Sequence, residues 1–131
     1  MLKSLHLGSW ARFITGQRLA PFVKTPADAR EAMLRLAALS PDEALVDLGA
    51  GDGAMLRTAV ERFGAASAVG YELDAELVRT AKLASADEPR IECHHAAAEE
   101  AEEALRAADV VTLYLSERGN ATLLPLLARS L

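Results

Sequence analysis

The chain has 131 residues, of which 51% are hydrophobic, so it can bury one core but leaves no room for a second domain of ordinary size. Its formal net charge of −5 provides no basic surface for a nucleic-acid backbone, so nucleic acid is not an expected partner. The chain has one cysteine, Cys93, so no disulfide framework is expected. It has no stretch of 18 apolar residues, so no membrane-spanning helix is expected either.

The first 20 residues differ in charge from the rest. Basic residues begin at Lys3, whereas the first acidic residue is Asp28. An acid-free amphipathic stretch is typical of a mitochondrial transit peptide, and also of an N-terminal helix that packs on the domain or on a membrane surface. We therefore treat residues 1–20 as a basic arm and residues 21–131 as the folded domain, with a mitochondrial or cytoplasmic location.

Beyond the arm, helical and strand patterns alternate. Thr25 is expected to cap the first helix, Pro26 to be its first residue, Gly64 to end the second helix and Asp74 to cap the third. Helices are expected at residues 26–39, 54–63, 75–86, 96–108 and 121–131, and strands at 45–48, 67–71, 90–95 and 110–115. This alternation predicts an α/β fold with a parallel sheet, right-handed crossovers and helices on both faces.

The first strand pattern leads into three glycines at alternate positions. Gly49, Gly51 and Gly53 let the backbone turn sharply and let a ligand approach without Cβ atoms in the way. Roughly twenty residues beyond them, Glu72 ends the next strand pattern, at the separation expected of an acid that binds ribose hydroxyls. The two features together predict a site for a nucleoside-containing cofactor.

Two carboxylates help to identify that cofactor. Asp47 precedes the glycines and Asp52 lies among them, and both would repel a pyrophosphate. They suit a phosphate-free cofactor with a positive centre, such as S-adenosylmethionine. The residues Asp-Leu-Gly-Ala-Gly-Asp-Gly at 47–53 and Gly-Tyr-Glu-Leu-Asp at 70–74 resemble the class I S-adenosylmethionine-dependent methyltransferases. The resemblance implies a Rossmann-like methyltransferase sheet in which the four strands have the order 3-2-1-4.

The resemblance also implies which residues contact S-adenosylmethionine. Asp47 either binds the cofactor's amino group or fixes the loop, and Asp52 either contacts the cofactor or caps the helix. The adenine position holds His94-His95-Ala96, so His95 or the backbone N–H of Ala96 would contact the base. The expected cofactor-binding residues are Thr25, Asp47, Gly49, Ala50, Gly51, Asp52, Gly53, Glu72, Leu73 and His95.

The two adjacent histidines also raise the question of a metal site. Neighbouring residues of a strand point to opposite faces, so His94 and His95 cannot easily share one ion. We expect no metal site.

A narrower resemblance concerns the methyl acceptor. The end of the fourth strand lacks the Asn-Pro-Pro-Tyr signature of enzymes that methylate nucleobases or glutamine. Residues 21–26 and 111–115 resemble the small protein-lysine methyltransferases, which include enzymes acting on the ATP synthase c subunit and the adenine nucleotide translocase, although Lys24 stands where those usually have proline. This implies a protein lysine acceptor, which can belong to a membrane protein. Phe22 and Tyr114 would line its channel, or else be core aromatics.

In that family three further strands follow the fourth, so the chain is expected to hold only the cofactor-binding half of the domain. The strand at 110–115 would then be an exposed apolar edge unless another chain, a self-pairing or the N-terminal arm covers it. Two functions stay open: a protein-lysine methyltransferase, and a catalytically inactive half-domain that acts as an assembly module. We expect cofactor binding to survive, and lysine transfer by this chain alone to be slow or absent.

Overall fold

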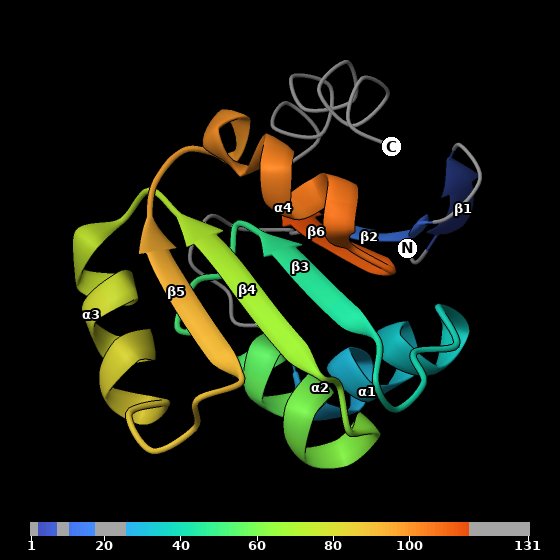
Figure 1. Ribbon diagram of the computed structural model, residues 1–131, viewed down its shortest axis with the longest axis horizontal. Helices are drawn as coiled ribbons and strands as arrows, with labels where there is room; N and C mark the ends of the chain where they lie inside the picture. The colour runs from blue at the N-terminus through green and yellow to red at the C-terminus, as the bar shows by residue number, and fades with distance from the viewer. Residues whose placement is uncertain (1–2, 8–10, 18–25, 116–131) are drawn as a thin grey trace.

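The computed structural model describes the backbone of residues 3–7, 11–17 and 26–115, and the side chains of residues 26–113. Six strands form one sheet in the order β1-β2-β6-β3-β4-β5 (Figure 1). The strands are β1 (Lys3–Leu7), β2 (Ala11–Gln17), β3 (Ala44–Leu48), β4 (Ser67–Glu72), β5 (Ile91–His95) and β6 (Val110–Leu115). The helices are α1 (Ala27–Leu36), α2 (Ala54–Phe63), α3 (Ala75–Ala84), the 3-10 helix η1 (Ala98–Ala101) and α4 (Glu102–Ala107).

The four strands expected from the sequence are all present. β5, β4, β3 and β6 are parallel neighbours in that order, which confirms the predicted order 3-2-1-4. β3 lies between β4 and β6, and its side chains Leu45, Val46 and Leu48 are buried. An apolar run without alternation is what a central strand requires, because helices cover both of its faces.

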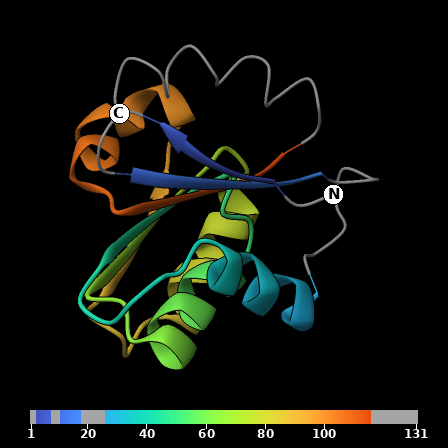
Figure 2. The ribbon, with the colours of Figure 1, turned by 90° about the vertical axis from the view of Figure 1, so that its right-hand side faces the viewer.

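Helices cover both faces of the sheet, as predicted. α1, α2 and α3 lie on one face, and η1 and α4 lie on the other (Figure 2). Alternate residues of β3 serve the two layers, since Leu45 packs into the core with α1 and α2 while Val46 and Leu48 pack with Leu105 of α4. The strand periodicity therefore fixes which side chains of β3 face which helices.

Two predicted helix ends are confirmed. Gly64 ends α2 in the left-handed conformation, with φ of 72°, and Asp74 caps α3 by accepting hydrogen bonds from the N–H groups of Glu76 and Leu77. α1 differs at both ends. Pro26 is its N-cap residue and not its first helical residue, and the helix stops at Leu36 because Ala38 adopts a left-handed φ of 56°.

The helix expected at 96–108 is also shorter than predicted. The N–H of Ala96 still pairs with the carbonyl of Glu72, and Ala97 remains extended, so helical structure begins only with η1 at Ala98. The carboxylate of Glu100 accepts the N–H of Ala97 at 2.9 Å and closes this tight first turn. The helix expected at 121–131 lies outside the described residues.

Residues 3–7 and 11–17 of the N-terminal arm form strands, so the alternative of an N-terminal helix is wrong for these residues. β1 and β2 are antiparallel, and β2 pairs in parallel with β6, which covers the edge of the fourth predicted strand. The chain passes from β2 through α1 to β3 on the same face, and in the same direction across the sheet, as it passes from β3 through α2 to β4 (Figure 2). The two crossovers therefore have the same hand, as parallel connections require.

None of the helices within the described ranges has the length and apolar character needed to cross a bilayer.

Candidate functional site

The glycine loop after β3 is built from left-handed backbone. Gly49, Gly51 and Gly53 have φ angles of 79°, 57° and 80°, which residues with side chains adopt only under strain. The N–H groups of Gly49 and Ala50 both donate to the carbonyl of Tyr71, at 2.9 and 3.0 Å, and tie the loop to β4. Apart from Gly51 and its two chain neighbours, no atom of the described residues lies within 4 Å of the position that a Cβ on Gly51 would take. At Gly51 the loop thus presents bare backbone to open space.

Glu72 at the end of β4 is held beside this loop. Its Oε1 accepts the N–H of Gly51 at 2.8 Å, and its Oε2 accepts the N–H of Asp74 at 2.9 Å. An ionised carboxylate has about four lone-pair positions, so each oxygen keeps capacity for a further donor. The acid is thus oriented by backbone groups while it remains able to accept hydrogen bonds from a ligand.

Asp47 is buried near the end of β3, on the side of β6. Its side chain is only 4% exposed, and its Oδ1 accepts a hydrogen bond from the hydroxyl of Thr112 at 2.8 Å. The two residues are register partners in the adjacent strands β3 and β6. Thr112 was not among the residues expected from the sequence, and its only signal was a hydroxyl within an otherwise apolar strand pattern.

Asp52 joins the loop to α2. Its Oδ1 accepts the N–H of Ala54 at 3.1 Å, and its carbonyl oxygen accepts a hydrogen bond from Nη1 of Arg57 at 2.8 Å. The N-cap residue of α2 is Gly53, so Asp52 is not the helix cap that the sequence allowed.

The adenine position expected after β5 is only partly available. The N–H of Ala96 is engaged by the carbonyl of Glu72 at 3.1 Å, which removes one of the two groups considered for this contact. His95 is exposed, with Nε2 at 3.0 Å from the carbonyl oxygen of Leu73, and the Leu73 side chain is 70% exposed. His95 and Leu73 thus form an open, partly apolar surface next to Glu72.

His94 points away from this surface. Its ring stacks on Tyr71 with a centroid separation of 5.1 Å, and its Nε2 is 3.3 Å from Oε2 of Glu92. The two histidines therefore face opposite sides of the sheet, as strand alternation predicts. Within the described ranges, no cluster of three or more histidine, cysteine, aspartate or glutamate side chains is arranged to hold a metal ion.

Asp47, Glu72 and His95 share one face of the sheet, at the carboxyl ends of its strands. Asp47 follows Leu45 by two positions, and Glu72 and His95 follow Ala68 and Ile91 by four, and these three apolar residues belong to the core packed against α1 and α2. Side chains separated by an even number of positions lie on the same face of a strand. The strand ends thus gather the candidate residues around the glycine loop.

Three expected site residues are not settled by this geometry. Phe22 and Thr25 lie outside the described residues. Tyr114 lies in β6, where its backbone is the register partner of Gly16 in β2, and its side chain is not described.

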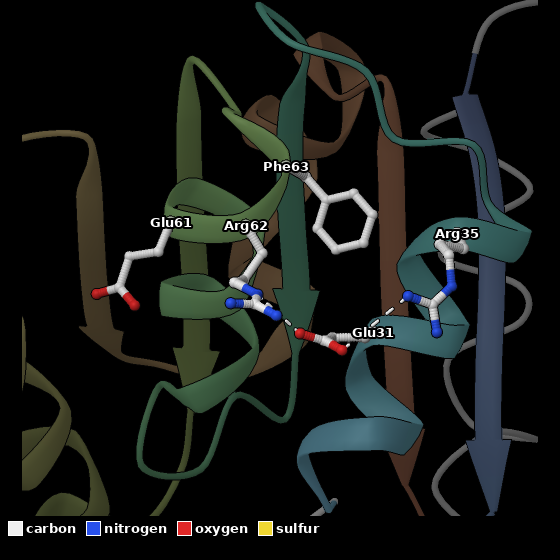
Figure 3. A pocket seen from close by; sticks show the side chains of 5 residues that line it. All are labelled: Glu31, Arg35, Glu61, Arg62 and Phe63. Atoms are coloured by element: carbon white, nitrogen blue, oxygen red, sulfur yellow. Dashed lines mark hydrogen bonds and ion pairs between the residues drawn. The ribbon is translucent and has the colours of Figure 1, made fainter.

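A cavity of about 400 Å³ lies between α1 and α2 (Figure 3). Glu31 is central to it and contacts Arg62 at 2.8 Å and Arg35 at 4.0 Å, with Phe63 alongside. Since α2 starts at the glycine loop and Phe63 ends it, this cavity is roughly 15 Å from the loop, one length of the ten-residue helix. Its paired charges join the two helices, and we assign it no chemistry.

Comparison with known proteins identifies the family. A model of the methyltransferase domain matches residues 45–130. A protein-lysine N-methyltransferase of Saccharolobus islandicus is 41% identical over 61 residues, which cover 47% of this chain and 38% of that protein. The chain therefore spans about two fifths of the length of this curated relative.

Solved structures agree with this match. The crystal structure of an RNA methyltransferase from Salinibacter ruber, in complex with S-adenosyl-L-homocysteine, is 34% identical, covers 82% of this chain and 71% of its own, and has a TM-score of 0.77. A methyltransferase from Geobacter sulfurreducens, with the same ligand, is 23% identical with a TM-score of 0.64 over 81% of this chain and 44% of its own, and supports the fold alone. The chain belongs to the methyltransferase domain family and has the class I methyltransferase fold.

Proposed function

We propose that the chain binds S-adenosylmethionine at the carboxyl edge of β3, β4 and β5, and that the protein transfers the methyl group to a lysine side chain of another protein. The observation that carries the cofactor proposal is Gly51. Its left-handed backbone faces open space, and its N–H holds the carboxylate of Glu72 at 2.8 Å. A ligand can therefore lie against the loop and reach the acid at the same time.

The residues present fit this cofactor. Glu72, oriented by two backbone donors, can accept hydrogen bonds from both ribose hydroxyls. Asp47 can balance the positive amino group of the methionine part, and the exposed Leu73 side chain can pack against the adenine ring. The Salinibacter ruber methyltransferase, which shares the fold at 34% identity, was crystallised with S-adenosyl-L-homocysteine, and this supports the choice of cofactor.

The protein's task in such a transfer is alignment. When bound, S-adenosylmethionine would supply a methyl group activated by a sulfonium sulfur, which is a good leaving group for displacement by a neutral lysine nitrogen. The glycine loop and Glu72 would hold the cofactor so that its methyl group faces the acceptor. The acceptor amine must be neutral, and an apolar channel lowers its pKa, so no dedicated base is required. We propose Phe22 and Tyr114 as residues of that channel.

The choice of lysine as acceptor rests on two observations. One is the match to the protein-lysine N-methyltransferase of Saccharolobus islandicus, and the other is the resemblance of residues 21–26 and 111–115 to such enzymes. RNA is the second candidate, because the solved structure at 34% identity is an RNA methyltransferase. The net charge of −5 disfavours RNA, since phosphate binding relies on an excess of lysine and arginine.

Cofactor binding is tested by calorimetry with S-adenosylmethionine and S-adenosyl-L-homocysteine. We expect wild type to bind both, Gly51→Arg to bind neither, and Glu72→Ala to bind at least about tenfold more weakly, as for the loss of charge-assisted hydrogen bonds. Gly64→Arg and Glu76→Ala are the controls, because Gly64 is another left-handed glycine and Glu76 an exposed acid, both outside the site. Equal affinity in wild type, Gly51→Arg and Glu72→Ala would refute the proposal.

The acceptor is tested with methyl-labelled S-adenosylmethionine and two substrates, a protein extract and total RNA. Label recovered as methyl-lysine after acid hydrolysis supports protein methylation, whereas label released by ribonuclease supports RNA. Because the chain spans 38% of the curated relative, we expect slow or absent transfer by this chain alone. Robust labelling of lysine by this chain alone would contradict both the expectation of slow transfer and the alternative of a catalytically inactive binding module.

A further inference from the structure

The hydroxyl of Thr112 is buried in a place where an apolar side chain would fit. Among residues 110–113 of β6, whose side chains are described, it is the one polar member, and it is 0% exposed. A buried hydroxyl destabilises the fold unless it is hydrogen-bonded, and this one donates to Oδ1 of Asp47 at 2.8 Å. Valine has nearly the same shape as threonine, so the hydroxyl itself requires an explanation.

This hydrogen bond joins β3 and β6, between which the strand order of the sheet reverses. From β3 the chain continues through α2 to β4 on one side, whereas β6, the last of the described strands in the chain, lies on the other side of β3. Ligands of open α/β sheets bind outside the carboxyl ends of the strands at such a switch point. Asp47 is followed by Leu48 and then by the glycine loop, so its carboxylate lies at this point, held by a residue 65 positions away in the chain.

We propose that Thr112 is a positioning residue, which fixes the direction of the Asp47 carboxylate so that the carboxylate receives the amino group of the cofactor's methionine part. This inference rests on the proposed cofactor. A carboxylate in a strand can rotate about its last bond, and a hydroxyl donor from the neighbouring strand restricts that rotation. A carboxylate has about four lone-pair positions, so one that accepts the Thr112 hydroxyl and makes a further contact can still accept an ammonium group.

A positioning role predicts a difference between two ligands. S-adenosyl-L-homocysteine has the amino-acid end, whereas 5′-methylthioadenosine has the same adenine and ribose without it. In Thr112→Val we expect affinity for S-adenosyl-L-homocysteine to fall by about tenfold or more and affinity for 5′-methylthioadenosine to stay unchanged. Thr112→Ser keeps the hydroxyl and should bind both ligands as wild type does.

The test measures both dissociation constants by ligand-detected NMR, with Thr58→Val as the matched control. Thr58 is also buried, at 8% exposure, and its hydroxyl donates to the carbonyl of Ala54 within α2, so its removal should not separate the two ligands. Asp47→Asn supplies a second route should Thr112→Val not fold, and it should produce the same separation. Parallel losses for both ligands, or no loss in Thr112→Val, would overturn the positioning role. A wild type that binds neither ligand would overturn the proposed function as well.

Discussion

Gly70 of β4 lies so close to Ala50 of the glycine loop that a Cβ on Gly70 would stand 2.6 Å from the Cβ of Ala50. It would also stand 2.8 Å from Cδ1 of Leu56 in α2. This close approach lets the loop rest on β4, where the N–H groups of Gly49 and Ala50 reach the carbonyl of Tyr71. Gly70 of β4 therefore supports the glycine loop as directly as the glycines of the loop itself.

Gly70→Ala is expected to destabilise the protein by roughly 1–3 kcal/mol, the usual range for overpacking a core. The measurement is urea unfolding combined with amide hydrogen exchange, in which Gly49 and Ala50 should exchange faster as the loop is displaced. Gly64→Ala is the control, because its Cβ would lie at an ordinary 3.6 Å from Pro41 and only the left-handed backbone would be strained. Unchanged exchange at Gly49 and Ala50 in Gly70→Ala would show that the loop does not depend on this contact.

Removing residues 1–17 is expected to make the chain associate with other copies of itself. β2 covers the edge of β6, and an uncovered apolar edge strand pairs with other chains. Light scattering over a concentration series should show growth in mass for the truncated chain only. A milder variant is Ile14→Pro, which disturbs the pairing of β2 with β1 and β6, with Ile14→Val as its control. A truncated chain that stays monomeric would mean that β6 needs no cover.

We propose a mitochondrial or cytoplasmic location, and residues 1–20 provide the test. If they act as a transit peptide, their fusion to a fluorescent reporter should direct the reporter into mitochondria. The structure adds a condition, because β2 (Ala11–Gln17) belongs to the sheet and must remain in the mature protein. N-terminal sequencing of the imported full-length chain checks this. A reporter spread through the cytosol would reject the targeting role.

Cys93 should react slowly with alkylating reagents in the folded protein. Burial raises the pKa of its thiol, against the opposing charges of Arg57 and Lys82, and only the thiolate is reactive. At pH 8 we expect iodoacetamide to modify the native chain more slowly than the chain in urea, and Arg57→Ala to be slower still. Because the pKa is raised, the contribution of the neutral thiol to folding stability is present below the ordinary pKa of a thiol and is lost as the pH rises through the higher pKa of the folded state. Equal rates in native and unfolded protein would contradict this assignment.

Much of the sheet could be predicted from local patterns. The strands around Val46, Val69 and Val111 are apolar runs bounded by turn signals, and right-handed crossovers leave few ways to order them. The N-terminal hairpin could not be predicted in the same way. Its apolar residues are interleaved with basic and polar ones without a strict period, which suits a helix as well as a strand, and what decides between them is pairing with β6, far away in the chain.

The same limit applies to the site. Glu72 could be expected beside the glycine loop because its spacing in the sequence is typical of a ribose-binding acid, and the structure places it there. Thr112 could not be identified, because a threonine in a strand is ordinary until the register shows it opposite Asp47. The engagement of the Ala96 N–H by Glu72 likewise depends on how β5 pairs with β4.

The position of β6 between β2 and β3 has a consequence for how the chain folds. Arg12 pairs with Val110, about a hundred residues later, and such distant pairings slow folding because a long loop must close before any contact stabilises it. During synthesis β2 and β3 leave the ribosome long before β6, so a gap one strand wide stays open between them. The growing chain must therefore keep two unpaired strand edges apart from other chains until residue 115 has emerged.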